Sequence, residues 1–160
     1  MATPEPLIVD VARLVRVEQL RGETDPSALD LGPTDGQIEP LGGIRYELRV
    51  ERLGHELLVQ GRVSQKTACL CSRCAGRFEL EAEERAFVAL YPLETGAEFI
   101  DLTPEMREAI ILALPGYPVC RSSCRGLCPV CGRNLNSGSC TCGSPGASGA
   151  WSVLDRLGRP

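Results

Sequence analysis

The sequence is poor in residues that several large classes of protein require. Aromatic residues make up only 4% of the chain, so a core must be built mainly from Leu, Val, Ile and Ala. The single histidine, His55, lies in a segment typical of a turn, and there is no Ser/His/Asp set and no HExxH motif. A phosphate-binding glycine loop and a nucleophile elbow are absent as well. We therefore predict that the protein is not an enzyme and has no small-molecule substrate.

Segments that direct a chain into or across a membrane are also missing. We find no charged-then-apolar leader, and the longest strongly apolar run, Ala109–Leu114, is far too short to cross a bilayer. We expect a soluble cytoplasmic protein whose thiols stay reduced, a setting in which clustered cysteines more often bind metal or carry redox chemistry than form disulfides. The odd number of cysteines, nine, also fits poorly with complete pairing.

Cysteine, in contrast, is abundant and clustered. Six of the nine lie between Tyr117 and Gly143, at positions Cys120, Cys124, Cys128, Cys131, Cys140 and Cys142. The segment CPVCG, Cys128 to Gly132, has the form of a zinc knuckle, in which two thiolates three positions apart grip one ion. We predict that Cys128 and Cys131 bind Zn²⁺ together with two of Cys124, Cys140 and Cys142. Four thiolates leave no open coordination position, so this zinc would be structural.

A second cysteine group comes earlier in the chain. Cys71-Ser72-Arg73-Cys74 is a CxxC between two strand-like segments, with Cys69 just before it. A thioredoxin-like redox pair needs a helix N-terminus behind it to lower the thiol pKa, and the sequence that follows has the pattern of a strand. Cys71 and Cys74 could instead join Cys120 or Cys124 at a second metal site. A thiol redox or metal-responsive switch that uses Cys71 and Cys74 is the alternative function.

Alternating apolar residues predict an antiparallel, β-rich domain in the first part of the chain. The predicted strands cover residues 7–18, 44–50, 57–63 and 78–91. Leu53–Glu56 has the composition of a hairpin turn between the second and third of these strands. In the last strand we expect the even-numbered residues, including Val88 and Leu90, to form one apolar face that Glu84 alone interrupts. Gly22–Gly43, with three prolines, predicts a long surface connection with room for one short strand.

One helix is well indicated near residues 103–114. Thr103 could cap it, Pro104 suits its first position, and an apolar stripe that includes Met106 and Ile110 predicts that it covers the sheet. We predict a β-rich α+β fold with an antiparallel and possible barrel-like sheet, one covering helix and a cysteine-rich zinc module. Residues 1–115 would form the β-rich domain, 116–143 the module, and 144–160 a flexible tail with a short helix.

Charge is unevenly divided between these parts. The whole chain has a formal charge of −4, but residues 116–160 contain five arginines and one aspartate, which leaves −8 for residues 1–115. Three of those arginines, Arg121, Arg125 and Arg133, lie around the cysteines and could bind RNA phosphates. The thiolates of a zinc site reduce this positive charge, and the arginines could equally serve solubility or pair with the acidic domain.

Three motifs resemble those of the YceD family of bacterial and plastid proteins. They are CSRC at Cys71–Cys74, IDLTPEMREAIILALPGYPVC at Ile100–Cys120, and CRGLCPVCGRNLN at Cys124–Asn136 with CTC at Cys140–Cys142. The resemblance implies a β-rich fold and a role in the accumulation of large-subunit ribosomal RNA. We therefore expect a non-enzymatic ribosome biogenesis factor that binds rRNA or a ribosomal protein. Its tail, from Ser144 on, departs from the shorter, more basic ending usual in relatives.

Overall fold

A computed structural model describes residues 6–14, 17–25, 27, 37–93 and 99–142. The predicted tail with its short helix, and most of the predicted connection between residues 22 and 43, lie outside these residues. Among the described residues, no helix has the length and apolar character that a membrane span requires.

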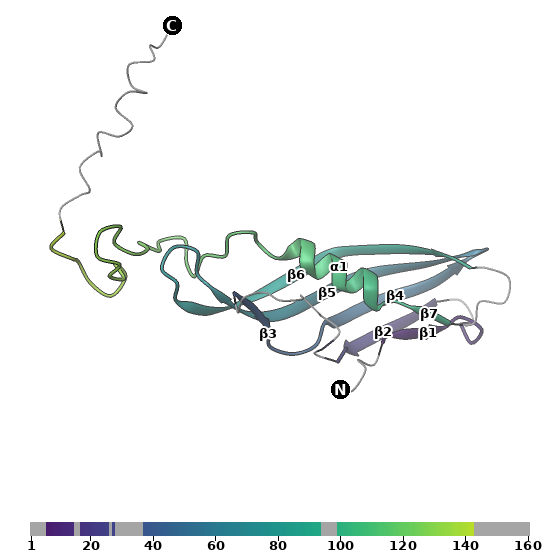
Figure 1. The fold of residues 1–160 in the computed structure, drawn as a ribbon. Coiled ribbons are helices and arrows are strands. Elements are labelled where there is room, and N and C mark those ends of the chain that lie inside the picture. Colours follow the sequence, from purple (N-terminus) through teal and green to yellow (C-terminus); the bar gives the residue numbers. More distant parts are fainter. Residues whose placement is uncertain (1–5, 15–16, 26, 28–36, 94–98, 143–160) are drawn as a thin grey trace, which may run out of the picture.

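Five antiparallel strands form the main sheet, in which β5 is the central strand (Figure 1). They are β2 (Val17–Glu23), β3 (Ile38–Pro40), β4 (Arg45–Leu53), β5 (Glu56–Leu70) and β6 (Arg77–Pro92). The order is β2-β4-β5-β3, and β6 pairs with β5 along its other side. In the described part of the chain β2 and β6 do not pair with each other, so the sheet curls as a half-barrel and is not closed.

The predicted first strand was wrong in its extent. Residues 7–18 contain two strands, β1 (Ile8–Asp10) and the start of β2, and β1 pairs with β7 (Phe99–Asp101) in a separate small sheet. The break follows Asp10, whose carboxylate accepts hydrogen bonds from the backbone N–H groups of Ala12 and Arg13. An aspartate that bonds the backbone two and three residues later favours a turn over a continued strand.

The predicted hairpin turn is confirmed, because Leu53 pairs with Glu56 and Gly54 has a φ of 61°. The predicted apolar face of β6, however, holds only for its first half. The register between β5 and β6 shifts after Gly61, where one residue of β5, Arg62, lies opposite two of β6, Arg85 and Ala86. This bulge reverses which residues face inward. Ala82 and Phe87 are therefore buried, whereas Val88 and Leu90 are 60% and 53% exposed.

Helix α1 (Thr103–Ala113) lies over β6 and β5 and buries Met106 and Ile110 against the core. The helix is confirmed, but its predicted cap was wrong. Leu102 is the N-cap residue, and the hydroxyl of Thr103 instead accepts a hydrogen bond from the backbone N–H of Leu7. This bond ties the chain before β1 to the start of the helix. Beyond α1 the chain returns to the end of the sheet at which β5 turns into β6 (Figure 1).

Candidate metal centres

Four cysteines from two distant parts of the chain form the first tetrad. Cys71 and Cys74 lie in the turn between β5 and β6, and Cys120 and Cys124 lie in the segment that follows α1. The four sulfur atoms all lie within 4.8 Å of one another. The tetrad thus joins the end of the β5–β6 hairpin to the C-terminal module, defined here as residues 116–142.

The second tetrad is local. Cys128 and Cys131 come from the predicted knuckle and Cys140 and Cys142 from the strand-free segment after it, with all four sulfur atoms again within 4.8 Å. Gly132 has a φ of 71°, which a glycine adopts without strain, and its N–H donates to the carbonyl of Cys128. The turn that brings the Cys128 and Cys131 thiols together therefore depends on Gly132, the glycine of the CPVCG motif.

The sulfur spacing fits a tetrahedral metal site. A zinc–sulfur bond of about 2.3 Å places the sulfur atoms of a regular tetrahedron about 3.8 Å apart. In the first tetrad the Cys71 and Cys124 sulfurs are 3.8 Å apart, and those of Cys74 and Cys120 are 3.9 Å apart. All nine cysteines are free, so neither tetrad is a pair of disulfides. Both tetrads could hold a metal ion.

Backbone amides favour the thiolate form of one cysteine in each tetrad. The N–H of Cys120 points at the Cys71 sulfur at 3.4 Å, and this contact lowers the pKa of Cys71 to about 6. The backbone N–H groups of Cys131 and Val130 lower the pKa of Cys128 to about 6 in the same way. Such N–H donors stabilise a charged sulfur, which is the form that binds metal.

One further thiol in each tetrad, Cys120 in the first and Cys142 in the second, is harder to ionise. Burial and the neighbouring cysteines raise the pKa of Cys120 to about 12. In the second tetrad the contact with Cys131 is the main cause that raises the pKa of Cys142, also to about 12. Four adjacent sulfurs cannot all carry a negative charge unless a cation is present to balance them. The geometry therefore offers four ligands that a divalent metal would convert to thiolates.

Asn136 lies beside the first tetrad and orders the loop around it. Its amide nitrogen donates to the Cys124 sulfur at 3.3 Å, while its side-chain oxygen accepts from the backbone N–H of Arg125 at 2.9 Å. The guanidinium of Arg121 donates to the same oxygen at 3.0 Å. Burial opposes ionisation of Cys124, but this amide contact contributes to a lowered pKa. The sequence pattern did not identify Asn136, because the residue is close to Cys124 only in the folded loop.

The structure divides the predicted metal ligands differently from the sequence. Cys124 was one candidate partner for Cys128 and Cys131, but it lies in the first tetrad with Cys71, Cys74 and Cys120. Cys69 is in neither tetrad, and its buried sulfur contacts the hydroxyl of Thr67. Burial also differs, since three members of the first tetrad are buried and Cys131 of the second is exposed.

The three arginines of the predicted RNA-binding set, Arg121, Arg125 and Arg133, are exposed on the module. None of them forms an ion pair in the described part of the chain, and residues 116–142 contain no Asp or Glu. Arg121 and Arg133 each donate to one oxygen of the module, Asn136 Oδ1 and the carbonyl of Ser139. Each guanidinium therefore has further donors that face solvent.

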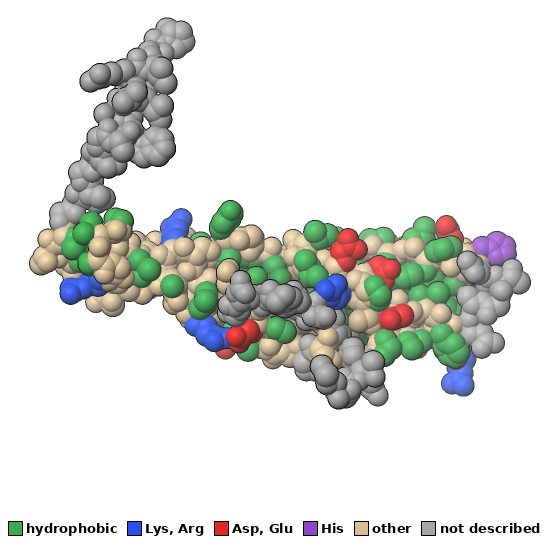
Figure 2. All heavy atoms as spheres, in the orientation of Figure 1, with side chains coloured by type: hydrophobic (Ala, Val, Ile, Leu, Met, Phe, Trp, Pro, Cys, Tyr) green, Lys and Arg blue, Asp and Glu red, His purple; other side chains and the backbone are tan. Residues whose placement is uncertain are grey.

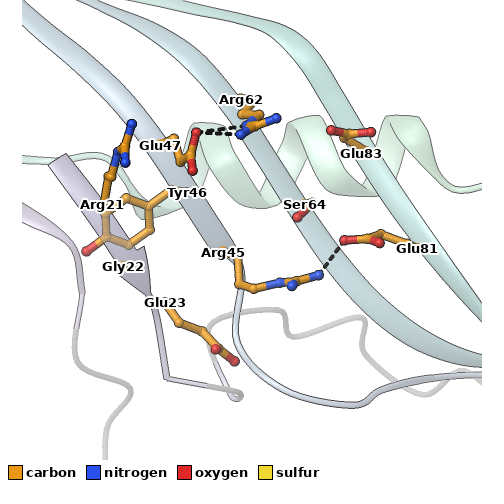
Figure 3. A pocket seen from close by; sticks show the side chains of 10 residues that line it. All are labelled: Arg21, Gly22, Glu23, Arg45, Tyr46, Glu47, Arg62, Ser64, Glu81 and Glu83. Carbon is orange, nitrogen blue, oxygen red and sulfur yellow. Dashed lines mark hydrogen bonds and ion pairs between the residues drawn. The ribbon is translucent and has the colours of Figure 1, made fainter. Parts of the chain in front are cut away.

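Most arginines of the sheet, in contrast, form ion pairs with glutamates: Arg45, Arg49, Arg62, Arg77 and Arg85. A hollow of about 520 Å³ lies on the sheet. Figure 3 shows its lining side chains on the face of the sheet turned away from α1. There Arg62 donates to Glu47 at 2.7 Å, and Arg45 pairs with Glu81. Because these side chains neutralise one another, the hollow has the character of a solvated charged sheet face and not of a binding site.

Several known proteins have sequences similar to this chain. An uncharacterized protein of Mycobacterium tuberculosis is 34% identical over 152 residues, which covers 82% of this chain and 72% of that protein. One of Mycobacterium leprae is 30% identical over 71% of this chain and 58% of its own length. A maize protein, the chloroplastic "Large ribosomal RNA subunit accumulation protein YCED homolog 1", is 46% identical over 44 residues, or 27% of this chain and 15% of that protein.

No solved structure matches the chain. The family described as "Large ribosomal RNA subunit accumulation protein YceD" matches residues 59–158, a range that contains both cysteine tetrads and α1. The match covers more than half of the chain and includes all three motifs of the sequence. The chain therefore belongs to the YceD family.

Proposed function

We propose that each tetrad binds one Zn²⁺ ion and that both ions are structural. Four cysteines at tetrahedral spacing are the ligand set that zinc prefers, and neither set leaves a position for a reacting water. Zinc at the first tetrad would fix the module to the hairpin between β5 and β6. Zinc at the second would order the loop from Cys128 to Cys142. Elemental analysis of chelator-washed protein should find about two zinc ions per chain, and well under one would overturn this proposal.

With the module ordered in this way, we propose that the protein is a non-enzymatic cytoplasmic factor in the accumulation of large-subunit rRNA. It contacts the rRNA through Arg121, Arg125 and Arg133. The observation that supports this proposal is the contrast in pairing: these arginines are exposed without carboxylate partners, whereas arginines such as Arg45 and Arg62 pair with glutamates of the sheet. A guanidinium held on an ordered loop can take a phosphate through two hydrogen bonds.

The charge of the metal centres limits the strength of this contact. Each zinc ion with four thiolates has a charge of about −2, so two centres, at about −4 together, more than offset the charge of the three arginines of the module. Attraction over long distances is therefore weak, and the arginines act by direct contact with phosphates. Phosphate contacts select no sequence, so the choice of rRNA would rest on RNA shape or on a ribosomal protein at the same location.

The test compares two triple variants of the full chain in binding to transcribed segments of large-subunit rRNA. One replaces Arg121, Arg125 and Arg133 with Gln, and the control replaces Arg49, Arg52 and Arg85, which are also exposed. Loss of three contacts to single-stranded RNA should reduce the slope of log K against log salt by about 2. The control should retain the slope. If the first variant binds as well as the parent at every salt concentration, a ribosomal protein becomes the partner to test.

One observation favours the alternative function, a thiol switch at Cys71 and Cys74. The pKa of Cys71 is lowered to about 6, as in reactive cysteines. Cys71 and Cys74 are, however, only 3% and 7% exposed, and a redox sensor needs an accessible sulfur. We therefore assign the low pKa to metal binding. Alkylation of the zinc-loaded protein at neutral pH should leave Cys71 unmodified, and fast labelling of Cys71 with zinc still bound would support the switch.

A further inference from the structure

Strand β6 presents an open edge in the described part of the chain. It pairs with β5 along one side, from Arg77 to Pro92, and with no other described strand. An unpaired strand edge offers a row of backbone donors and acceptors to a passing chain. Proteins that accept an extended peptide at such an edge obtain affinity from the backbone and specificity from the side chains beside it.

A groove accompanies this edge where β6 meets α1. Its volume is about 310 Å³, and its apolar lining comes from Ala86, Phe87, Val88, Ala109 and Leu112. Val88 is 60% exposed because the bulge in β6 turns it outward, and Leu112 of α1 is 77% exposed. Figure 2 shows hydrophobic side chains over α1 and the neighbouring strands, with acidic side chains set among them. Among the described residues, none covers the side chains of Val88 and Leu112 further.

The charged residues of the groove all have one sign. Glu84, Glu105 and Glu108 line it, and no Lys or Arg does. Glu105 accepts a hydrogen bond from the hydroxyl of Tyr91 at 2.8 Å, and Glu84 accepts from the backbone N–H of Ala86 at 2.7 Å. These bonds hold two of the carboxylates in place beside the apolar lining. An occupant with positive charge and apolar side chains would complement all of these features.

We propose that the open edge of β6 and the groove beside α1 bind an extended, basic segment of a partner protein. In such a segment Lys or Arg residues alternate with apolar ones. The backbone of the segment adds to β6, its apolar side chains cover Val88 and Leu112, and its charged ends meet Glu84, Glu105 and Glu108. This surface lies apart from the metal centres, so the proposal does not depend on them.

The same charges argue against two other occupants. A nucleic acid would bring phosphates toward three carboxylates, which repel them. A second copy of this chain that paired edge to edge would bring its own β6 glutamates (Glu79, Glu81, Glu83 and Glu84) toward the same residues. Like charges opposite each other in neighbouring strands are destabilising. A basic peptide is the occupant that the edge attracts.

The test measures binding of two labelled synthetic peptides to the full-length, zinc-loaded protein by fluorescence anisotropy. One peptide has ten residues that alternate Arg and Val, and the other alternates Glu and Val. A triple variant of the groove, Glu84→Gln, Glu105→Gln and Glu108→Gln, keeps oxygens that can accept the bonds from Ala86 and Tyr91. A control variant makes the same change in charge on strands that do not pair with β6, at Glu18 of β2 and at Glu47 and Glu51 of β4.

The basic peptide should bind, the acidic one should not, and the groove variant should bind the basic peptide about tenfold more weakly. The control variant should bind the basic peptide with an affinity within twofold of the parent's. Amide shifts in NMR spectra should map to β6 and α1. The proposal is overturned if both variants lose affinity equally, since attraction is then diffuse, or if the shifts map to another face. It is also overturned if the protein forms a dimer through β6.

Discussion

Loss of one ligand from either tetrad should release one zinc ion, but the two losses should have different structural results. Cys74→Ser removes a ligand of the first tetrad, which joins the module to the sheet. Cys140→Ser removes one of the second, whose ligands all lie between residues 128 and 142. We expect the first variant to detach the whole module, and the second to loosen only residues 128–142.

The contacts that would remain explain this difference. Without zinc, and apart from the contacts between sulfurs, five hydrogen bonds cross the junction. Three are the shorter ones: Ser72 N–H to the Pro118 carbonyl at 2.8 Å, Leu127 N–H to the Arg73 carbonyl at 3.0 Å, and the Arg73 guanidinium to the Cys124 carbonyl at 3.2 Å. Two are longer, at 3.4 Å each: the Arg73 guanidinium to the Ser122 carbonyl and the Cys120 N–H to the Cys71 sulfur. At about 1 kcal/mol each, they contribute on the order of 5 kcal/mol. A structural zinc in a small peptide supplies about 10–16 kcal/mol at neutral pH. The hydrogen bonds cannot replace it.

Metal analysis and amide hydrogen exchange on both variants would check this prediction. Each should contain about one zinc fewer than the parent. Cys74→Ser should lose protection at residues 118–127 as well as 128–142, while Cys140→Ser keeps it at 118–127. The strands should stay protected in both, because the main core contains no member of either tetrad. Equal loss of protection in the two variants would show that the tetrads are one cooperative unit and refute the reasoning.

Two further predictions follow from single residues. Gly61→Ala should lower the free energy of unfolding by about 1–3 kcal/mol, because a Cβ there would lie 2.1 Å from the carbonyl oxygen of Glu47. Gly116 has open space around it, so Gly116→Ala should lower the free energy of unfolding much less. Chemical denaturation of both variants measures the difference. Asn136→Leu removes the amide contact to Cys124, and competition with a chromophoric chelator should show about 10–100-fold weaker zinc binding at the first tetrad. Unchanged zinc affinity would show that Asn136 only orders the loop.

The sheet and helix could be predicted because their signals are local. The alternation that ends in Val50, the turn at Gly54 and the stripe with Met106 and Ile110 each depend on neighbours within a few positions. The bulge in β6 could not be predicted from the alternation, since Gly61 in the neighbouring strand is compatible with a bulge but does not fix which residues of β6 it displaces. It reversed the exposure of Val88 and so created the apolar lining of the groove.

The division of the cysteines could be predicted only in part. The CxxC at Cys71 and the knuckle at Cys128 each indicated a ligand pair, but which cysteines complete each set depends on the path of the chain after α1. That path brings Cys124 to Cys71, a residue 53 positions earlier, instead of to Cys128, four positions later. Spacing in the sequence favours the nearer pairing, whereas the fold selects the distant one.

Cross-linking in living cells, followed by sequencing of the bound RNA, tests the proposed function most directly. The parent chain should yield large-subunit rRNA, with cross-linked peptides from residues 116–142. The variant that lacks Arg121, Arg125 and Arg133 should lose most of that signal, while the variant at Arg49, Arg52 and Arg85 keeps it. If the parent recovers no more large-subunit rRNA than the module variant does, the protein does not act through rRNA contacts of its module.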